Sequence, residues 1–138
     1  MIVQLEGRID ILINNAGLPC PGAVLDQTPE KMRLVFETNV ISVLYLCQTV
    51  APYMNSQQRK GKIINIGSIV SDAPTPFAGI YCASKCAIAA ITDVLRQELY
   101  PFGIQVCLVQ PGAIQSNIGK NGIGSIILPH PDSLMVLD

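Results

Sequence analysis

The chain has few charges, one histidine and no tryptophan, and these shortages exclude several classes of function. Charged residues make up 14% of its 138 residues, and the formal net charge is −1. Nucleic-acid binding needs a concentrated cationic surface, and the strongest basic cluster is only Arg59-Lys60-Gly61-Lys62. A solvated turn is the simpler interpretation of that cluster, so we expect no nucleic-acid partner.

The cysteine pattern does not indicate a disulfide framework or a metal centre. There are five cysteines, an odd number without paired spacing. A zinc site usually takes four nitrogen or sulfur ligands. Cys82 and Cys86 share a helical face, but His130, the single histidine, is far along the chain. We expect reduced, mostly buried thiols and no metal.

Membrane-spanning and secretory signals are also missing from the sequence. No uninterrupted apolar run approaches the ~18 residues that a spanning helix needs. The first residues, Met1 to Glu6, have no cationic start and no small-residue cleavage site. We therefore expect a cytoplasmic protein without a membrane span, with attachment to a membrane surface left open.

Three short apolar runs rich in β-branched residues each end in turn residues. Such runs are typical of strands buried on both faces of a parallel sheet. They are Ile9–Ile13 before Asn14-Asn15-Ala16-Gly17, Lys62–Ile66 before Gly67-Ser68, and Ile104–Val109 before Pro111-Gly112.

Helical patterns separate these strands. Thr28 followed by Pro29 is a helix start signal and predicts a helix from about Pro29 to Glu37. A second helix, from Asn39 to about Asn55, is apolar nearly all round and should be buried on more than one side. A third is predicted from Tyr81 to Tyr100. Alternating strands and helices predict an α/β fold with right-handed crossovers, in which ligands bind beyond the carboxyl ends of the strands.

Tyr81 and Lys85 are the first candidates for chemistry. Residues four apart on a helix share a face, and a neighbouring ammonium favours the phenolate and lowers the tyrosine pKa. The pair would then serve as an acid and base near neutral pH. The spacing alone also arises by chance, so it is a weak signal without further residues.

Ser68 and Asn39 add to this signal, although each has a simpler explanation. Ser68 follows the second strand, where its hydroxyl would bond a substrate carbonyl as charge develops; a turn-capping hydroxyl is the alternative. Asn39 opens an apolar helix, either as an N-cap or as a buried amide that holds a water. The Asn14–Gly17 turn either ends a strand or lets a flat ligand approach the backbone.

Taken together, these residues resemble the short-chain dehydrogenase/reductase family. The resemblance runs from about Gly7 to Ser116, and Ser68 precedes Tyr81 by 13 positions, the usual spacing of the family. The matching motifs, in order, are Asn14-Asn15-Ala16-Gly17, Thr38-Asn39-Val40, Ser68, Tyr81-Cys82-Ala83-Ser84-Lys85 and Pro111-Gly112-Ala113-Ile114-Gln115-Ser116.

The resemblance implies a catalytic tetrad. Tyr81 would donate a proton to a carbonyl oxygen, and Ser68 would orient and polarise that carbonyl. Lys85 would lower the pKa of Tyr81 and bind the nicotinamide ribose, while Asn39 would anchor a water that links Lys85 to solvent.

The resemblance also implies cofactor contacts. The implied cofactor is NADP, with NAD as the alternative. Tyr81 and Lys85 would contact it, and the other contacts are expected at Asn14, Ala16, Gly17, Ile114 and Ser116. Family members usually have threonine at position 116, so Ser116 is a mild departure that keeps the hydroxyl.

The family's TGxxxGxG turn, which holds the cofactor pyrophosphate, does not occur in these 138 residues. The resemblance therefore implies a partial, three-layer, doubly wound Rossmann-like sheet that lacks the first three strands and the last one. Residues 1–118 would form the central and C-terminal part of that domain, and residues 119–138 would be an irregular piece of the substrate loop. We expect such a chain to bind cofactor poorly, because the glycine turn supplies the amide donors for phosphate.

Residues 113–119 and 76–79 are similar to those of 1-acyl-dihydroxyacetone-phosphate reductases, a weaker resemblance than that to the family. It implies a lipid-like carbonyl substrate and association with the endoplasmic reticulum or lipid droplets. The family also implies a homodimer or homotetramer. The rival hypothesis is a non-catalytic module that pairs with a full-length subunit through the helices predicted over Asn39–Asn55 and Tyr81–Tyr100.

Overall fold

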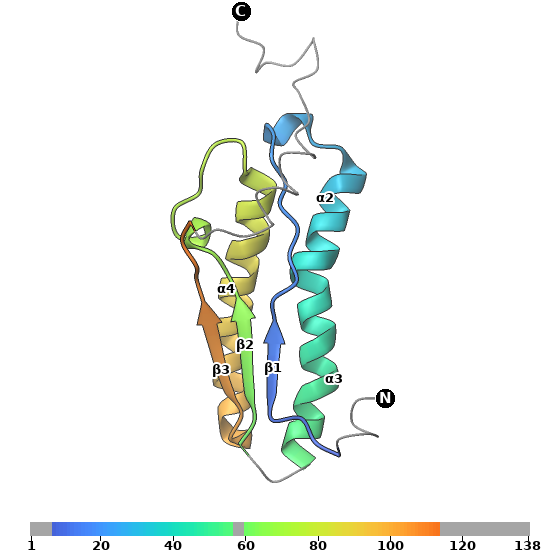
Figure 1. Ribbon diagram of the computed structural model, residues 1–138, viewed down its shortest axis with the longest axis vertical. Coiled ribbons are helices and arrows are strands. Elements are labelled where there is room, and N and C mark those ends of the chain that lie inside the picture. The colour runs from blue at the N-terminus through green and yellow to red at the C-terminus, as the bar shows by residue number, and fades with distance from the viewer. Residues whose placement is uncertain (1–6, 57–59, 114–138) are drawn as a thin grey trace, which may run out of the picture.

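Three parallel strands form one sheet in the order β1-β2-β3 (Figure 1). The computed structural model describes residues 7–56 and 60–113. Ile11 of β1 is aligned with Lys62 of β2, which is aligned in turn with Gln105 of β3. The strands are β1 (Ile11–Asn14), β2 (Lys62–Ile66) and β3 (Gln105–Val109).

The helices alternate with the strands, so the α/β prediction is confirmed. Thr28 caps the first long helix as predicted, because its hydroxyl accepts from the Lys31 amide at 3.3 Å and Pro29 takes the first helical position. The helices, with their short flanking turns, are η1 (Val24–Asp26), α2 (Pro29–Phe36), η2 (Glu37–Ile41), α3 (Ser42–Ser56), η3 (Ile69–Ser71), α4 (Gly79–Leu99) and η4 (Tyr100–Phe102).

The expected break between the first two helices is wrong. α2, the π-helical turn η2 and α3 follow one another without interruption over residues 29–56. Asn39 lies inside the π turn, and its side chain bonds no amide of that turn, so it is not an N-cap. A π turn in a helix is rare and occurs frequently at functional sites.

This 28-residue helix also changes an expectation about membranes. By length and composition alone it could cross a bilayer, because an 18-residue window within it has a mean hydropathy of 1.4. We expected no such segment, because we counted uninterrupted apolar residues and placed a helix end near Glu37. The helix packs one side against the sheet, and the core helices of globular proteins pass the same test, so this is weak evidence for a span.

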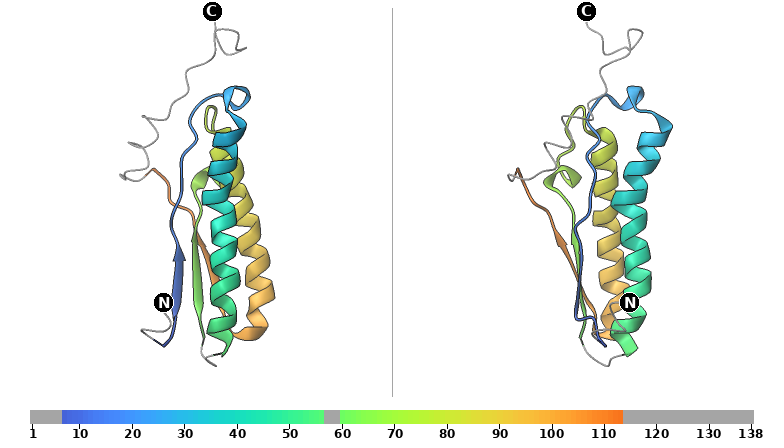
Figure 2. Two further views of the ribbon diagram at one scale, coloured as in Figure 1. Left: turned by 90° about the vertical axis from the view of Figure 1, so that its right-hand side faces the viewer. Right: turned by 45° about the vertical axis from the view of Figure 1, so that its right-hand side comes forward.

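The helices cover one face of the sheet, as Figure 2 shows edge-on. Their apolar sides enclose a core whose buried members are Val40, Val43, Cys47, Val50, Met54, Ile63, Ile88, Ile104 and Val106. On the other face, Ile11 and Ile13 are 56% and 58% exposed. The strands are therefore not buried on both faces within the described residues, and those residues form two layers rather than three.

The second long helix is also less buried than its composition predicted. Tyr45 is 65% and Tyr53 43% exposed on α3, because only the stripe that includes Val43, Cys47 and Val50 faces the sheet.

Candidate active site

The carboxyl ends of the three strands meet at one rim, at the upper end of the sheet in Figure 1. Hydrogen bonds join the segments that leave β2 and β3. The Gly67 amide donates to the Val109 carbonyl at 2.8 Å, and the Ile69 amide donates to the Pro111 carbonyl at 3.1 Å. These bonds hold Ser68 beside the Pro-Gly turn, where ligands of parallel α/β sheets bind.

Helix α4 brings Tyr81 and Lys85 to the same rim, because it begins at Gly79 and both residues lie in its first two turns. The Lys85 ammonium lies 5.7 Å from the centre of the Tyr81 ring. The Ser68 hydroxyl is within hydrogen-bonding reach of the Tyr81 phenol. It also caps η3 by accepting from the Val70 amide at 3.4 Å. The structure thus brings Ser68, Tyr81 and Lys85 together and shows the capping role of Ser68, while its bond to a substrate carbonyl stays a prediction.

The expectation that Lys85 lowers the pKa of Tyr81 is not met in this structure. Burial raises the pKa of Tyr81, the bond with Ser68 opposes that rise, and the neighbouring Cys82 adds to it. Burial lowers the pKa of Lys85 itself. The Lys85 ammonium donates to the Ile66 carbonyl at 2.8 Å. Desolvation is the largest cause of both shifts.

Asn39 is 1% exposed and fastens two segments to each other. Its Oδ1 accepts from the Leu18 amide at 2.7 Å, and its Nδ2 donates to the Leu18 carbonyl at 3.0 Å and to the Ser84 hydroxyl at 2.9 Å. Both amide protons and one lone pair of Oδ1 are engaged. The second lone pair of Oδ1 remains for the relay water that the resemblance implies.

Ser84 is a site residue that the sequence reasoning did not single out. It is fully buried, accepts from Asn39 and donates to the Tyr81 carbonyl at 2.7 Å. Ser84 therefore connects the π turn to the first turn of α4. Its place in the Tyr81–Lys85 motif was the available signal, but the local sequence does not reveal a partner 45 residues away.

Gly17 lies against the same group of side chains. A Cβ built on Gly17 would lie 3.6 Å from both Asn39 Oδ1 and the Lys85 ammonium. The loop after β1 therefore passes directly over the buried amide and ammonium. Ala16 precedes Gly17 in this loop and is exposed.

The Asn14 side chain faces the core instead of the rim. Its Nδ2 donates to Asn65 Oδ1 at 2.8 Å, and Asn65 Nδ2 donates to the Thr92 hydroxyl at 2.9 Å. All three residues are buried, and Asn14 Oδ1 has no partner among the described atoms. A contact between Asn14 and the cofactor would have to come from its backbone. The two remaining cofactor candidates, Ile114 and Ser116, lie outside the described residues.

The residues at the rim fit one end of a nicotinamide cofactor. Lys85 is 4% exposed and supplies a buried cation directly beneath Gly17, whose backbone passes close to the ammonium. The phosphate end has no such support, because these 138 residues contain no TGxxxGxG turn. No group of three or more His, Cys, Asp and Glu side chains in residues 7–56 and 60–113 has metal-binding geometry.

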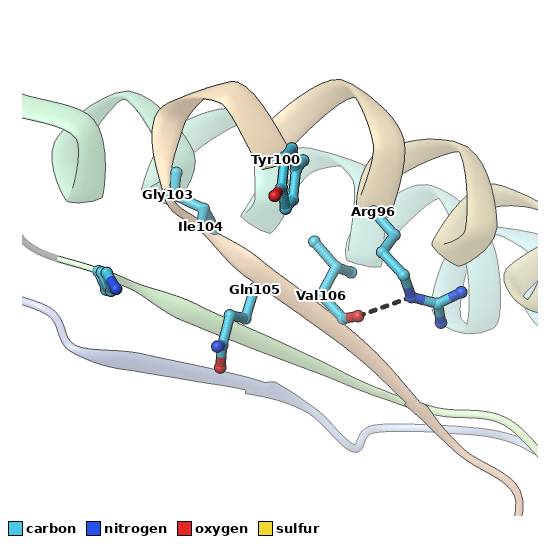
Figure 3. A pocket seen from close by; sticks show the side chains of 7 residues that line it. Arg96, Tyr100, Gly103, Ile104, Gln105 and Val106 are labelled. Atoms are coloured by element: carbon cyan, nitrogen blue, oxygen red, sulfur yellow. Dashed lines mark hydrogen bonds between the residues drawn. The ribbon is translucent and has the colours of Figure 1, made fainter.

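A separate pocket of about 310 Å³ lies at the opposite end of β3 (Figure 3). Arg96 lines it and is engaged on both sides: Nε donates to the Val106 carbonyl at 3.0 Å, and Nη1 pairs with Asp93 at 2.7 Å. The lining residues of the pocket are Lys60, Arg96, Tyr100, Gly103, Ile104, Gln105 and Val106.

Comparison with known proteins agrees with this geometry. The family model of the short chain dehydrogenases matches residues 1–123. The chain belongs to the short-chain dehydrogenase family. A curated relative, the 3-ketodihydrosphingosine reductase of Bacteroides thetaiotaomicron, is 42% identical over 120 residues, which are 87% of this chain and 44% of that protein.

Solved structures of the family agree in fold. The gluconate 5-dehydrogenase of Burkholderia cenocepacia, crystallised with NADP and tartrate, superposes with a TM-score of 0.83 at 29% identity, over 86% of this chain and 46% of that one. An NAD⁺-bound xylitol dehydrogenase superposes with a TM-score of 0.79 at 30% identity, over 83% of this chain and 44% of that one. The predicted partial Rossmann fold is thus confirmed. The chain spans less than half the length of each of these relatives.

Proposed function

We propose that this chain carries the catalytic residues of an NAD(P)-dependent carbonyl reductase. The observation that supports this most strongly is the meeting of three groups at the rim. The Ser68 hydroxyl is within hydrogen-bonding reach of the Tyr81 phenol, and the Lys85 ammonium is 5.7 Å from that ring.

Each residue has a role in the proposed reduction. A nicotinamide held beside Lys85 would supply the hydride that adds to the carbonyl carbon. Ser68 donates a hydrogen bond to the carbonyl oxygen and stabilises the charge that develops there. The Tyr81 phenol gives its proton to the same oxygen, which yields the alcohol. The phenol holds the proton that this step needs, because burial raises the pKa of Tyr81 above its ordinary value.

Lys85 and Asn39 act around this centre. The Lys85 ammonium is placed to bind the nicotinamide ribose and to supply positive charge near Tyr81. Asn39 holds Leu18 and Ser84, so it fixes the loop after β1 over the cofactor position. It also offers its remaining lone pair to a relay water that leads from Lys85 to solvent.

The finer assignment is an NADPH-dependent reductase of a lipid-like ketone, such as 1-acyl-dihydroxyacetone phosphate. The name of the bacterial relative, a 3-ketodihydrosphingosine reductase, supports a long-chain ketone. The gluconate dehydrogenase carries NADP and the xylitol dehydrogenase NAD⁺, so both cofactors occur in the same fold. We propose NADPH as the cofactor, a homodimer or homotetramer as the assembly of the whole protein, and the cytoplasm or a lipid-bearing membrane surface as its location.

We also propose that these 138 residues alone have weak activity, because they contain no glycine turn to bind the pyrophosphate. Titration of NADPH should give a dissociation constant well above the micromolar range. A micromolar constant would refute this part of the proposal.

Replacement of the phenol tests the chemistry. Single-turnover oxidation of NADPH by excess protein, with a methyl ketone as substrate, should slow by about a hundredfold or more in Tyr81→Phe, the usual loss for an acid–base group. Tyr100→Phe is the matched control, because Tyr100 is 81% exposed at the other end of α4 and should react as the unmodified chain does. Equal rates in the unmodified chain and Tyr81→Phe would rule out the proposed proton donor.

A second candidate function is association with another subunit through α3 and α4. The outer sides of these helices carry large exposed apolar side chains, among them Tyr45, Tyr53 and Val94 at 65%, 43% and 51% exposure. Tyr81→Phe should leave such association intact, so sedimentation of that variant separates the two functions.

A further inference from the structure

We propose that the pocket at the amino end of β3 binds a small phosphate monoester that carries an apolar group. Gln105 and Val106 of β3 line this pocket, whereas Ser68 lies beside the other end of the same strand (Figure 3). Its volume of about 310 Å³ is at the lower end of the range for small-molecule sites, about 300–1,000 Å³. Because the candidate active site takes no part in it, the inference does not depend on the proposed reductase function.

Two cationic side chains, Lys60 and Arg96, line the pocket, and no carboxylate of the described residues does. Lys60 belongs to the basic cluster that the sequence alone assigned to a solvated turn. A Cβ built on Gly103 would lie 3.8 Å from Lys60 Cγ, so the lysine stem lies over the connection from α4 to β3. Within residues 7–56 and 60–113 the Lys60 ammonium forms no hydrogen bond or ion pair, so it remains free to bind a ligand.

Arg96 presents a guanidinium that two contacts already hold in place. Nε donates to the Val106 carbonyl at 3.0 Å, and Nη1 pairs with Asp93 at 2.7 Å. A guanidinium has five N–H donors, so three of them have no partner in the described part of the chain. An ordered side chain loses less conformational freedom when it binds an anion.

The backbone around the pocket does not contribute to anion binding. The amides of three consecutive lining residues, Gly103 to Gln105, all donate to carbonyls of neighbouring segments within 3.3 Å. The carboxyl end of a helix also carries about half a negative charge, and α4 ends beside the pocket. That charge opposes an anion in part. Recognition therefore depends on the Lys60 and Arg96 side chains, and we expect weak binding.

The remaining side chains add an apolar surface. Ile104 and Val106 are each 3% exposed, and the ring of Tyr100 is 81% exposed beside them. A phosphate monoester carries about 1.5 to 2 negative charges at neutral pH and has three acceptor oxygens. Its phosphate matches the two cations, and an attached ring or short alkyl group matches the apolar surface.

Phenyl phosphate is the probe, because it joins such a phosphate to a flat ring. Titrated into the 138-residue chain without nicotinamide, it should bind with a dissociation constant of about 1 mM, the value usual for a ligand of about ten heavy atoms. Saturable chemical shift changes are expected at the amides of Gly103, Ile104 and Gln105. Inorganic phosphate and phenol each carry one half of the probe, and each should bind about tenfold more weakly.

Lys60→Gln should weaken the binding of phenyl phosphate about two- to fivefold at physiological ionic strength, the usual effect of an exposed ion pair. Lys60 is exposed, so the variant should keep the fold, which circular dichroism checks. Lys62→Gln is the matched control, because Lys62 carries the same charge two positions away and does not line the pocket. Tyr100→Ala removes the exposed ring and should reduce the preference for phenyl phosphate over inorganic phosphate.

Saturable binding at the three amides that Lys60→Gln weakens and Lys62→Gln does not would support the proposal. Three results would overturn it. The first is the absence of saturable shifts at these amides. The second is an equal loss in both lysine variants, which would mean attraction to the general charge of this end of the sheet. The third is binding of inorganic phosphate or phenol as tight as that of phenyl phosphate, since the pocket would then recognise only one half of the ligand.

Discussion

Replacing Thr92 by valine should destabilise the fold, because it breaks a buried row of polar side chains that ends at the candidate site. Thr92 is fully buried, accepts from Asn65 Nδ2 at 2.9 Å and donates to the Ile88 carbonyl at 2.6 Å. Valine keeps the shape but removes the hydroxyl that accepts from Asn65 Nδ2, which leaves a fully buried amide nitrogen without that partner. A buried donor left in this way costs about 1–3 kcal/mol.

Thr49→Val is the matched control. The Thr49 hydroxyl also donates to the carbonyl four residues earlier, Tyr45, at 2.8 Å, but it is exposed and no buried amide depends on it. We expect this variant to stay within about 0.5 kcal/mol of the unmodified chain. Only the buried amide partner distinguishes the two substitutions.

Urea unfolding followed by circular dichroism measures both variants. A loss of 2 kcal/mol and a slope of about 2 kcal/mol per molar urea place the Thr92→Val midpoint about 1 M lower. Equal midpoints for Thr92→Val and Thr49→Val would refute the reasoning. They would mean that Asn65 finds another partner and that the polar row does not stabilise the end of β1.

Three further predictions concern the core and the rim. Gly61→Ala should lower the free energy of unfolding by about 1–3 kcal/mol in the same assay, because the new Cβ would overlap the fully buried Met54; an unchanged midpoint contradicts this. Burial lowers the pKa of Lys85, so the folded state binds this proton less tightly than the unfolded state. As pH rises from the lowered pKa toward 10.5, the unmodified chain should therefore gain stability relative to Lys85→Met. Urea midpoints of both variants over this pH range measure the gain. No change in the difference between the midpoints would mean that the amine is not desolvated. Asn39→Leu should cost about 2–4 kcal/mol and speed hydrogen exchange at the Leu18 amide, because three hydrogen bonds of the buried Asn39 side chain are lost. Slow exchange would show that other contacts hold the loop.

The sequence predicted the local elements of the fold well, because their signals are local. β2 was predicted with its observed bounds, β1 and β3 within a few residues, and the cap at Thr28 at its observed position. The convergence of Ser68, Tyr81 and Lys85 also followed, since parallel strands place their carboxyl ends at one edge.

The features that the sequence did not reveal depend on distant partners. The π turn at Glu37–Ile41 has no composition signal, and the bonds from Asn39 to Leu18 and Ser84 span 21 and 45 positions. Asn65 was not singled out in the sequence, because its partners lie on β1 and α4. The exposed face of the sheet was missed for another reason. An apolar strand has the same sequence pattern whether helices cover one face of its sheet or both.

The direction of the Tyr81 pKa shift was missed for a related reason. Spacing places an ammonium near a phenol, but it does not measure how much water the two groups lose. In the structure Lys85 is nearly inaccessible and Tyr81 is half-buried, so desolvation decides both shifts.

The π turn has a consequence for the spacing of the whole chain. The Ser42 amide bonds the Glu37 carbonyl five residues back, so the helix carries one residue more than a regular α-helix needs there. Each α-helical residue advances the direction of the side chains by about 100°. Deleting a single residue between positions 37 and 41 would restore regular winding, but everything after the deletion would be rotated by that angle relative to everything before it. Either the Asn39 side chain or the apolar stripe of α3 would then point to solvent. This stretch should therefore tolerate point replacements far better than changes in length.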